Sequence, residues 1–209
     1  MSFADETRAA FRRGDTAGVQ RLAEAEAARA RAAGEPAAEV EALYALARVA
    51  LRGDDLPRAE QLARAALGVA LRAGDRSLEE RPRHVLAAAA RMSGDHATAR
   101  DRYEESIALN RELGRDGTVR TELYNLAFTE LHLGNPGRAR ELFAHSRGIG
   151  EQYEAIADAA LAAADGDHAR AARALEAAGA AFTAAGQVPD PDDAAEMARV
   201  RAILSGELS

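Results

Sequence analysis

One short pattern recurs along the chain and limits what the chain can fold into. A glycine is followed by an aspartate or asparagine and then by an alanine, at Gly53–Ala59, Gly94–Ala99, Gly134–Ala139 and Gly166–Ala171. Glycine readily adopts the left-handed backbone conformation that ends a helix, and aspartate or asparagine caps the start of the next helix. Each copy therefore predicts a sharp turn between two helices.

The spacing of the final alanines gives the length of a repeat. Ala59, Ala99 and Ala139 lie 40 positions apart, and Ala171 follows after 32. A period of this length made of two helices is typical of helical solenoids, in which each repeat packs mainly against its neighbours. We therefore expect an all-α fold in a single domain that spans residues 1–209.

The turn residues divide the chain into five helix pairs and one further helix. The pair at 3–34 follows the pattern least and is expected to cap the N-terminal end of the stack. A joint with two prolines precedes the last helix, 192–205, whose polar outer face suits a C-terminal cap. The four repeats between these caps are expected at 37–75, 78–114, 119–150 and 152–186.

Charge and composition exclude several classes of partner. The net charge of −7 and the pI near 5.3 argue against nucleic acid and against an anionic membrane surface. The chain has no cysteine, and hence neither a disulfide nor a thiolate metal site. No apolar run approaches the ~18 residues that a membrane span needs, and the N-terminus lacks an apolar signal segment. We expect a cytoplasmic protein without a cofactor.

The pattern resembles tetratricopeptide repeats, in the longer variety of about 40 residues that is similar to arrays in bacterial regulatory and signalling proteins. That family has three small residues in each repeat, where helices come into near backbone contact. The positions are filled by Ala47, Ala59, Ala66, Ala87, Ala99, Ser106, Ala127, Ala139, Ser146, Ala159, Ala171 and Ala178. The resemblance covers 37–186, and 3–34 more loosely. It implies a right-handed α-α superhelix of about five helix pairs plus a C-terminal capping helix.

Some residues depart from the family or need a structural interpretation. Glu130 and Asp158 fall where the family has buried apolar residues, and a buried unpaired carboxylate is costly. We expect both to pair with arginines or to be partly exposed. Tyr103 and Phe143 lie at second-helix positions that normally pack between helices, and we expect them in the core.

In this family the first helix of each pair lines the concave face, so the resemblance implies a set of groove residues. They are Tyr44, Arg48, Arg52, Arg81, His84, Arg91, Tyr124, Phe128, His132 and Tyr153. Arginine pairs bidentately with carboxylates, and aromatic rings give flat apolar contact. All 27 cationic residues are arginine, which would place some arginine on any helix surface. The aromatic residues beside them favour a groove for an acidic or extended protein or peptide segment.

Three functions remain open at this level. The first is a protein-binding scaffold, and the second is a regulatory sensor that binds a small molecule or a signal peptide. An enzyme is not expected, because the sequence lacks nucleophile, zinc-protease and phosphate-loop motifs, although His84, Tyr124, Glu130 and His132 could form a site. His96 and His168 occupy equivalent turn positions and are not expected to bind a metal. Self-association through the helix at 16–33 is a further alternative.

Overall fold

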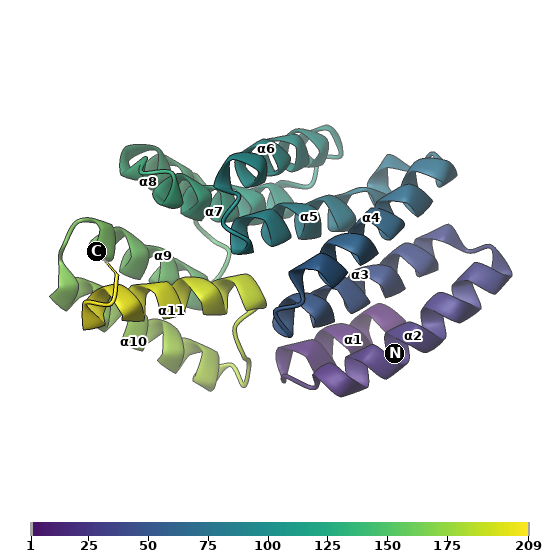
Figure 1. The fold of residues 1–209 in the computed structure, drawn as a ribbon, viewed down its shortest axis with the longest axis horizontal. Coiled ribbons are helices and arrows are strands. Elements are labelled where there is room, and N and C mark those ends of the chain that lie inside the picture. The colour runs from purple at the N-terminus through teal and green to yellow at the C-terminus, as the bar shows by residue number, and fades with distance from the viewer. Residues whose placement is uncertain (1, 209) are drawn as a thin grey trace. The chain divides into compact units, whose positions relative to one another are not determined.

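A computed structural model describes residues 2–208 of the 209-residue chain. These residues form eleven α-helices and one short 3-10 helix, with no strand among them (Figure 1). The α-helices are α1 (Phe3–Arg12), α2 (Thr16–Ala33), α3 (Pro36–Arg52), α4 (Leu56–Ala73), α5 (Glu80–Met92), α6 (His96–Glu112), α7 (Asp116–His132), α8 (Pro136–His145), α9 (Glu151–Ala164), α10 (His168–Ala184) and α11 (Pro191–Ser205). The all-α class and the order of helices expected from the sequence are confirmed.

The chain divides into two compact units. Unit 1 is Met1–Gly94 and contains α1 to α5, and unit 2 is Asp95–Ser209 and contains α6 to α11. The boundary falls at the turn inside the repeat that was expected at 78–114. The single domain expected from the sequence stays a prediction.

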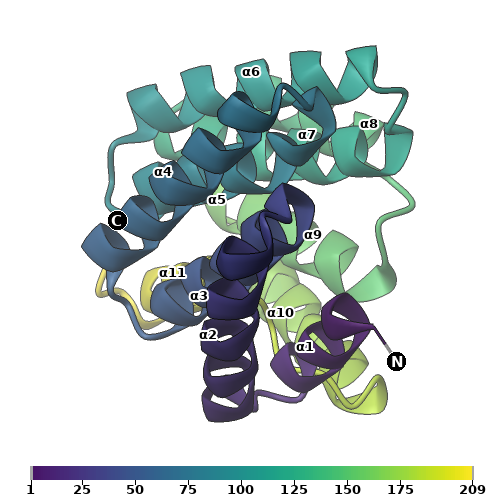
Figure 2. The same ribbon diagram turned by 90° about the vertical axis from the view of Figure 1, so that its right-hand side faces the viewer.

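In unit 1 each helix packs against the next along the chain. The contacts run from α1 to α2, α3, α4 and α5 in turn, and α3 also contacts α5 directly. Figures 1 and 2 both show α1 lying beside α2. The α3–α5 contact joins the first helices of two adjacent pairs, which is how a solenoid builds a continuous face.

In unit 2 most helices also pack against the next helix along the chain, but the last helix folds back. Consecutive helices from α6 to α10 pack in order, and α7 also contacts α9. The last helix, α11, folds back and packs on both α9 and α10 (Figure 1). Its buried residues include two carboxylates, so the side that was expected to be a polar outer face is partly directed into the unit.

Most of the turns follow the chemistry of the repeated pattern. The side chains of Asp55, Asp95 and Asp167 each accept a hydrogen bond from the backbone N–H three residues later, at 3.0, 3.1 and 3.0 Å. In the last three copies the glycine has φ between 74° and 85°. In the first copy Gly53 has φ −85°, and Asp54 takes the left-handed conformation with φ 59°.

The small-residue positions confirm the register of the repeats. Eleven of the twelve have no exposed surface, and Ser146 is 3% exposed. Ser106 also donates a hydrogen bond of 2.9 Å to Glu122, so a small position here satisfies a buried carboxylate. Tyr103 and Phe143 are buried, as expected.

The two unusual acidic residues have different partners. Asp158 pairs with Arg147 at 3.2 Å and is partly exposed, as expected. Glu130 is buried, and its partner is not an arginine, because Asn135 donates to it at 2.7 Å. The side chain of Asn135 makes no cap to α8, so this residue satisfies the carboxylate instead of the helix start.

The small positions should tolerate added volume poorly. Ala66 is fully buried in α4 and its neighbour Ala65 is exposed. We expect Ala66→Leu to lower the free energy of unfolding by about 1–3 kcal/mol, because extra methylenes overpack a dense core. Urea unfolding followed by circular dichroism measures the change.

The matched control is Ala65→Leu, which adds the same atoms to the exposed side of the same helix. Its free energy of unfolding should change by less than about 0.5 kcal/mol. Equal stability of the two variants would contradict the close helix approach at this position.

Candidate functional site

A cavity of unit 1 gathers charged and aromatic side chains from three helices. It encloses about 170 Å³ between α1, α3 and the start of α5. Its charged and aromatic lining consists of Arg8, Phe11, Glu41, Tyr44, Arg48, Glu80 and Arg81. We call this set the arginine pocket. Three arginines and two glutamates leave it one positive charge in excess, in a chain whose net charge is −7.

Aromatic rings orient the guanidinium groups of the pocket. The Cζ atom of Arg48 lies 3.8 Å from the ring centroid of Phe11, and that of Arg52 lies 4.2 Å from the same ring. The Cζ atom of Arg81 lies 5.0 Å from the ring centroid of Tyr44. Stacking uses the flat face of a guanidinium, whereas its N–H donors lie in the plane. The rings therefore stack on the flat faces of these guanidinium groups and fix their orientation.

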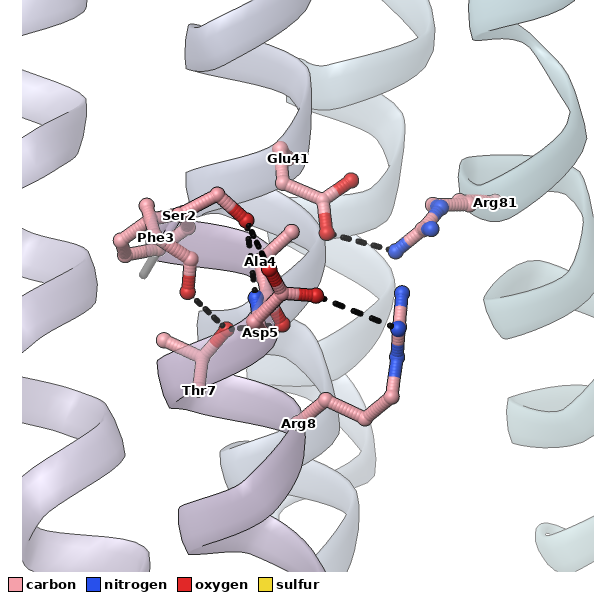
Figure 3. A network of polar contacts seen from close by, with 8 residues as sticks. All are labelled: Ser2, Phe3, Ala4, Asp5, Thr7, Arg8, Glu41 and Arg81. Carbon is pink, nitrogen blue, oxygen red and sulfur yellow. Dashed lines mark hydrogen bonds and ion pairs between the residues drawn. The ribbon is translucent and has the colours of Figure 1, made fainter.

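Two carboxylates lie beside the arginines (Figure 3). Arg81 donates to Glu41 at 2.6 Å, in a pair that is about one third and one fifth exposed. Arg8 lies 3.7 Å from Asp5 in an exposed pair, which contributes little to stability. Hydrogen bonds from Ser2 hold the pKa of the Asp5 carboxyl below its ordinary value, so Asp5 is ionised at neutral pH. Figure 3 shows the heads of Arg8 and Arg81 directed toward the same space.

In unit 2 the corresponding face is covered by α11. The hydroxyl of Tyr124 donates to Asp193 at 2.8 Å, and the Nε2 atom of His132 lies 2.9 Å from a carboxylate oxygen of Glu196. Asp193 and Glu196 are only 4% and 6% exposed, and Tyr124 only 3%. Two carboxylates of the chain's own helix thus occupy the groove side of α7.

Several predicted groove residues of unit 2 therefore do not line an open groove. Tyr124 and His132 face α11 and are not open to an external partner. Phe128 is fully buried, with its ring 4.9 Å from those of both Tyr124 and Phe143, and belongs to the core. Tyr153 joins the same aromatic cluster, with its ring 6.1 Å from that of Tyr124.

The remaining expected residues lie in unit 1. Tyr44, Arg48 and Arg81 line the arginine pocket, and Arg52 stacks beside it on Phe11. His84 is half-buried and is not among the lining residues. Arg91 is buried, with 3% of its surface exposed, which contradicts its assignment to an open groove.

Some residues of the pocket and of α11 were not predicted, although the sequence carries signals for them. Arg8 stands 40 positions before Arg48, so extending the groove register into the loosely matching first pair would have found it. Asp193, Glu196, Met197 and Val200 follow the spacing of one helix face. That spacing predicts a buried stripe, but two of its members are acidic, and acidic residues suggest a solvated surface.

The residues considered for catalysis do not assemble as expected within unit 2. Glu130 accepts from Asn135, while the carboxylate near His132 is Glu196. The ring of His132 stacks on that of His96, with centroids 4.4 Å apart. No group of three potential metal ligands occurs among residues 2–208, and no helix in that range is long and apolar enough to cross a membrane.

The hydrogen bond between Tyr124 and α11 leads to a prediction about the Tyr124 hydroxyl. Tyr124→Phe removes a donor to the buried Asp193 carboxylate, and we expect the docking of α11 to weaken by about 1–3 kcal/mol. Hydrogen exchange of the α11 amides should become faster in proportion, because opening of this helix costs less free energy.

A control on the same helix separates this contact from the general effect of losing a hydroxyl. Thr121 is exposed on α7, and its hydroxyl donates to the carbonyl of Gly117. Thr121→Val should leave the exchange of α11 unchanged. If Tyr124→Phe also leaves it unchanged, the bond to Asp193 does not hold α11.

Comparison with known proteins gives no family assignment from sequence, because no family model and no curated protein match the chain. The solved structures that are similar in fold include the following two. One is a Rap protein, solved in complex with competence and sporulation factor; the TM-score is 0.72 at 14% identity, over 96% of this chain and 57% of that one. This chain therefore spans less than two thirds of the Rap protein. The other is BtubC (BKLC) from P. vanneervenii, with a TM-score of 0.60 at 23% identity over 92% of both chains. At these identities the similarity shows a shared fold, the helical-repeat fold of the tetratricopeptide kind.

Proposed function

We propose that this chain binds a protein or peptide segment of acidic character, and that the arginine pocket holds the segment's carboxylates. The observation that carries the proposal is the convergence of Arg8, Arg48 and Arg81 from three helices on one cavity. Guanidinium groups recognise carboxylates through paired N–H donors, and the rings of Phe11 and Tyr44 hold two of them in place.

The size of the cavity favours a side chain of a larger partner over a whole small molecule. Sites for drug-sized ligands usually enclose about 300–1,000 Å³. The arginine pocket encloses about 170 Å³. This supports the scaffold function over a small-molecule sensor.

The similarity to a Rap protein is consistent with this proposal. That protein was solved in complex with competence and sporulation factor, so a fold of this kind accommodates a bound partner. The acidic chemistry of the partner proposed here comes from the arginines of this chain and not from that complex.

The proposal is tested with a fluorescein-labelled oligo-aspartate peptide and the full chain. A hydrogen bond to a charged group is worth about 1.5–3 kcal/mol, so we expect Arg48→Gln to weaken binding by about tenfold or more. Arg48→Lys keeps the charge but loses the paired donors. Its affinity for the peptide should lie between that of the wild type and that of Arg48→Gln. Fluorescence anisotropy measures each affinity, and circular dichroism checks that each variant stays helical.

Arg21→Gln is the matched control, because Arg21 is exposed on α2 and lies outside the pocket. It makes the same change of charge and should leave the affinity within about twofold of wild type, since a distant exposed charge is screened by salt. An equal loss in the Arg21 and Arg48 variants would show a diffuse charge effect and no pocket.

A further inference from the structure

We infer that a carboxylate of the acidic segment is held between Arg8 on α1 and Arg81 on α5, so that α1 closes on the bound segment. The inference rests on the proposed function and assigns a conformational step to the same pocket. It makes binding of the acidic segment and docking of α1 two coupled events, and it gives an exposed arginine of the first helix a direct part in recognition.

One wall of the arginine pocket is made by α1. Ala4, Thr7, Arg8 and Phe11 all line the pocket, and their spacing is that of a single helix face. The other lining residues come from α3 and α5, with Val19 from α2. An anion in this pocket therefore lies between α1 and the rest of unit 1.

Arg8 and Arg81 belong to different helices, and Figure 3 shows their heads directed toward the same space. The side chain of Arg8 is 46% exposed and that of Arg81 is 34% exposed, so a ligand can reach both from solvent. Two guanidinium charges repel each other, and an anion between them offsets this repulsion. Guanidinium groups also offer paired N–H donors to carboxylate oxygens. The two heads thus provide a site for a carboxylate.

The partners that these two arginines already have leave room for a further anion. Arg81 donates through Nη1 to Glu41 at 2.6 Å. A guanidinium carries five N–H donors, so this bond does not saturate Arg81. The head of Arg8 lies 3.7 Å from Asp5, which is longer than a hydrogen bond. Asp5 accepts a hydrogen bond of 2.7 Å from Ser2 and attracts Arg8 by charge.

The attachment of α1 to unit 1 is small enough for a ligand to change. The helix has ten residues, and a helix of this length is marginal on its own. Its buried residues are Thr7, Ala10 and Phe11. The last two belong to the small apolar cluster that joins α1 to α2 and α3. Elements with few buried apolar contacts open at a low cost in free energy, so docking of α1 is a step that a ligand can bias.

The size of the effect follows from linkage. A ligand that contacts both α1 and α5 binds the docked state of α1 in preference to the open state. It stabilises docking by the factor 1 + [L]/Kd, which is about eleven when the free ligand is at about ten times its Kd. The exchange of α1 amides that depends on undocking should slow by the same factor.

The probe is the oligo-aspartate peptide, added to the full chain at about ten times its Kd. We expect hydrogen exchange of the α1 amides to slow by about tenfold, and exchange of the α10 amides in unit 2 to stay unchanged. Arg8→Gln should weaken binding by about tenfold, as measured by fluorescence anisotropy. It should also abolish the slowing of α1 exchange, even when the peptide saturates the variant. Arg8 is exposed, so its substitution leaves the core of unit 1 intact.

Arg13→Gln is the matched control. Arg13 is the exposed residue that follows α1, and helical spacing places it opposite the side that lines the pocket. The substitution makes the same change of charge beside the same helix. It should leave the affinity within about twofold of wild type and preserve the slowing of α1 exchange. An equal loss of affinity in the Arg8 and Arg13 variants would overturn the role of Arg8.

Three further results decide the inference. If oligo-aspartate binds and α1 exchange stays unchanged, the carboxylate does not join α1 to α5 and the inference is overturned. If Arg8→Gln binds as tightly as wild type while Arg48→Gln loses affinity, the inference is also overturned and the proposed function stands. If the wild-type chain does not bind oligo-aspartate at all, the proposed function fails as well.

Discussion

The structure depends on the close approach of helices at the small-residue positions of each repeat. At these places an alanine or serine has almost no exposed surface, so a larger side chain would separate the backbones. Since the same three positions recur in every repeat, they also fix which side of each first helix faces its neighbours. The arrangement of groove side chains follows from this packing register, which is why Tyr44 and Tyr124 make comparable contacts 80 residues apart.

The regular part of the fold could be predicted from the sequence because its signals are local. Glycine followed by a capping aspartate marks three of the four repeated turns, and the buried small residues confirm the 40-residue register. Burial of the predicted groove residues was harder to foresee, because it depends on a helix distant in the chain. Nothing near Tyr124 in sequence indicates that Asp193, 69 residues later, would bind its hydroxyl.

The burial of several acidic residues was hard to predict for the same reason. Glu122, Glu130, Asp193 and Glu196 are all buried, although carboxylates are ordinarily exposed. Their partners include a serine, an asparagine, a tyrosine and a histidine, and none of these pairs is marked by sequence spacing alone. Asp158 pairs with an arginine and could be predicted, because it is partly exposed on a surface rich in that residue.

The covalent attachment of α11 has a consequence for stoichiometry. A repeat protein carries copies of one face and could, in principle, bind one ligand on each. A tethered helix acts at an effective concentration of about a millimolar or more, so free ligands at much lower concentration do not displace it. The face of unit 2 is thus already saturated by its own chain. A helix of the chain that covers such a face lowers the number of ligands that a repeat protein can bind.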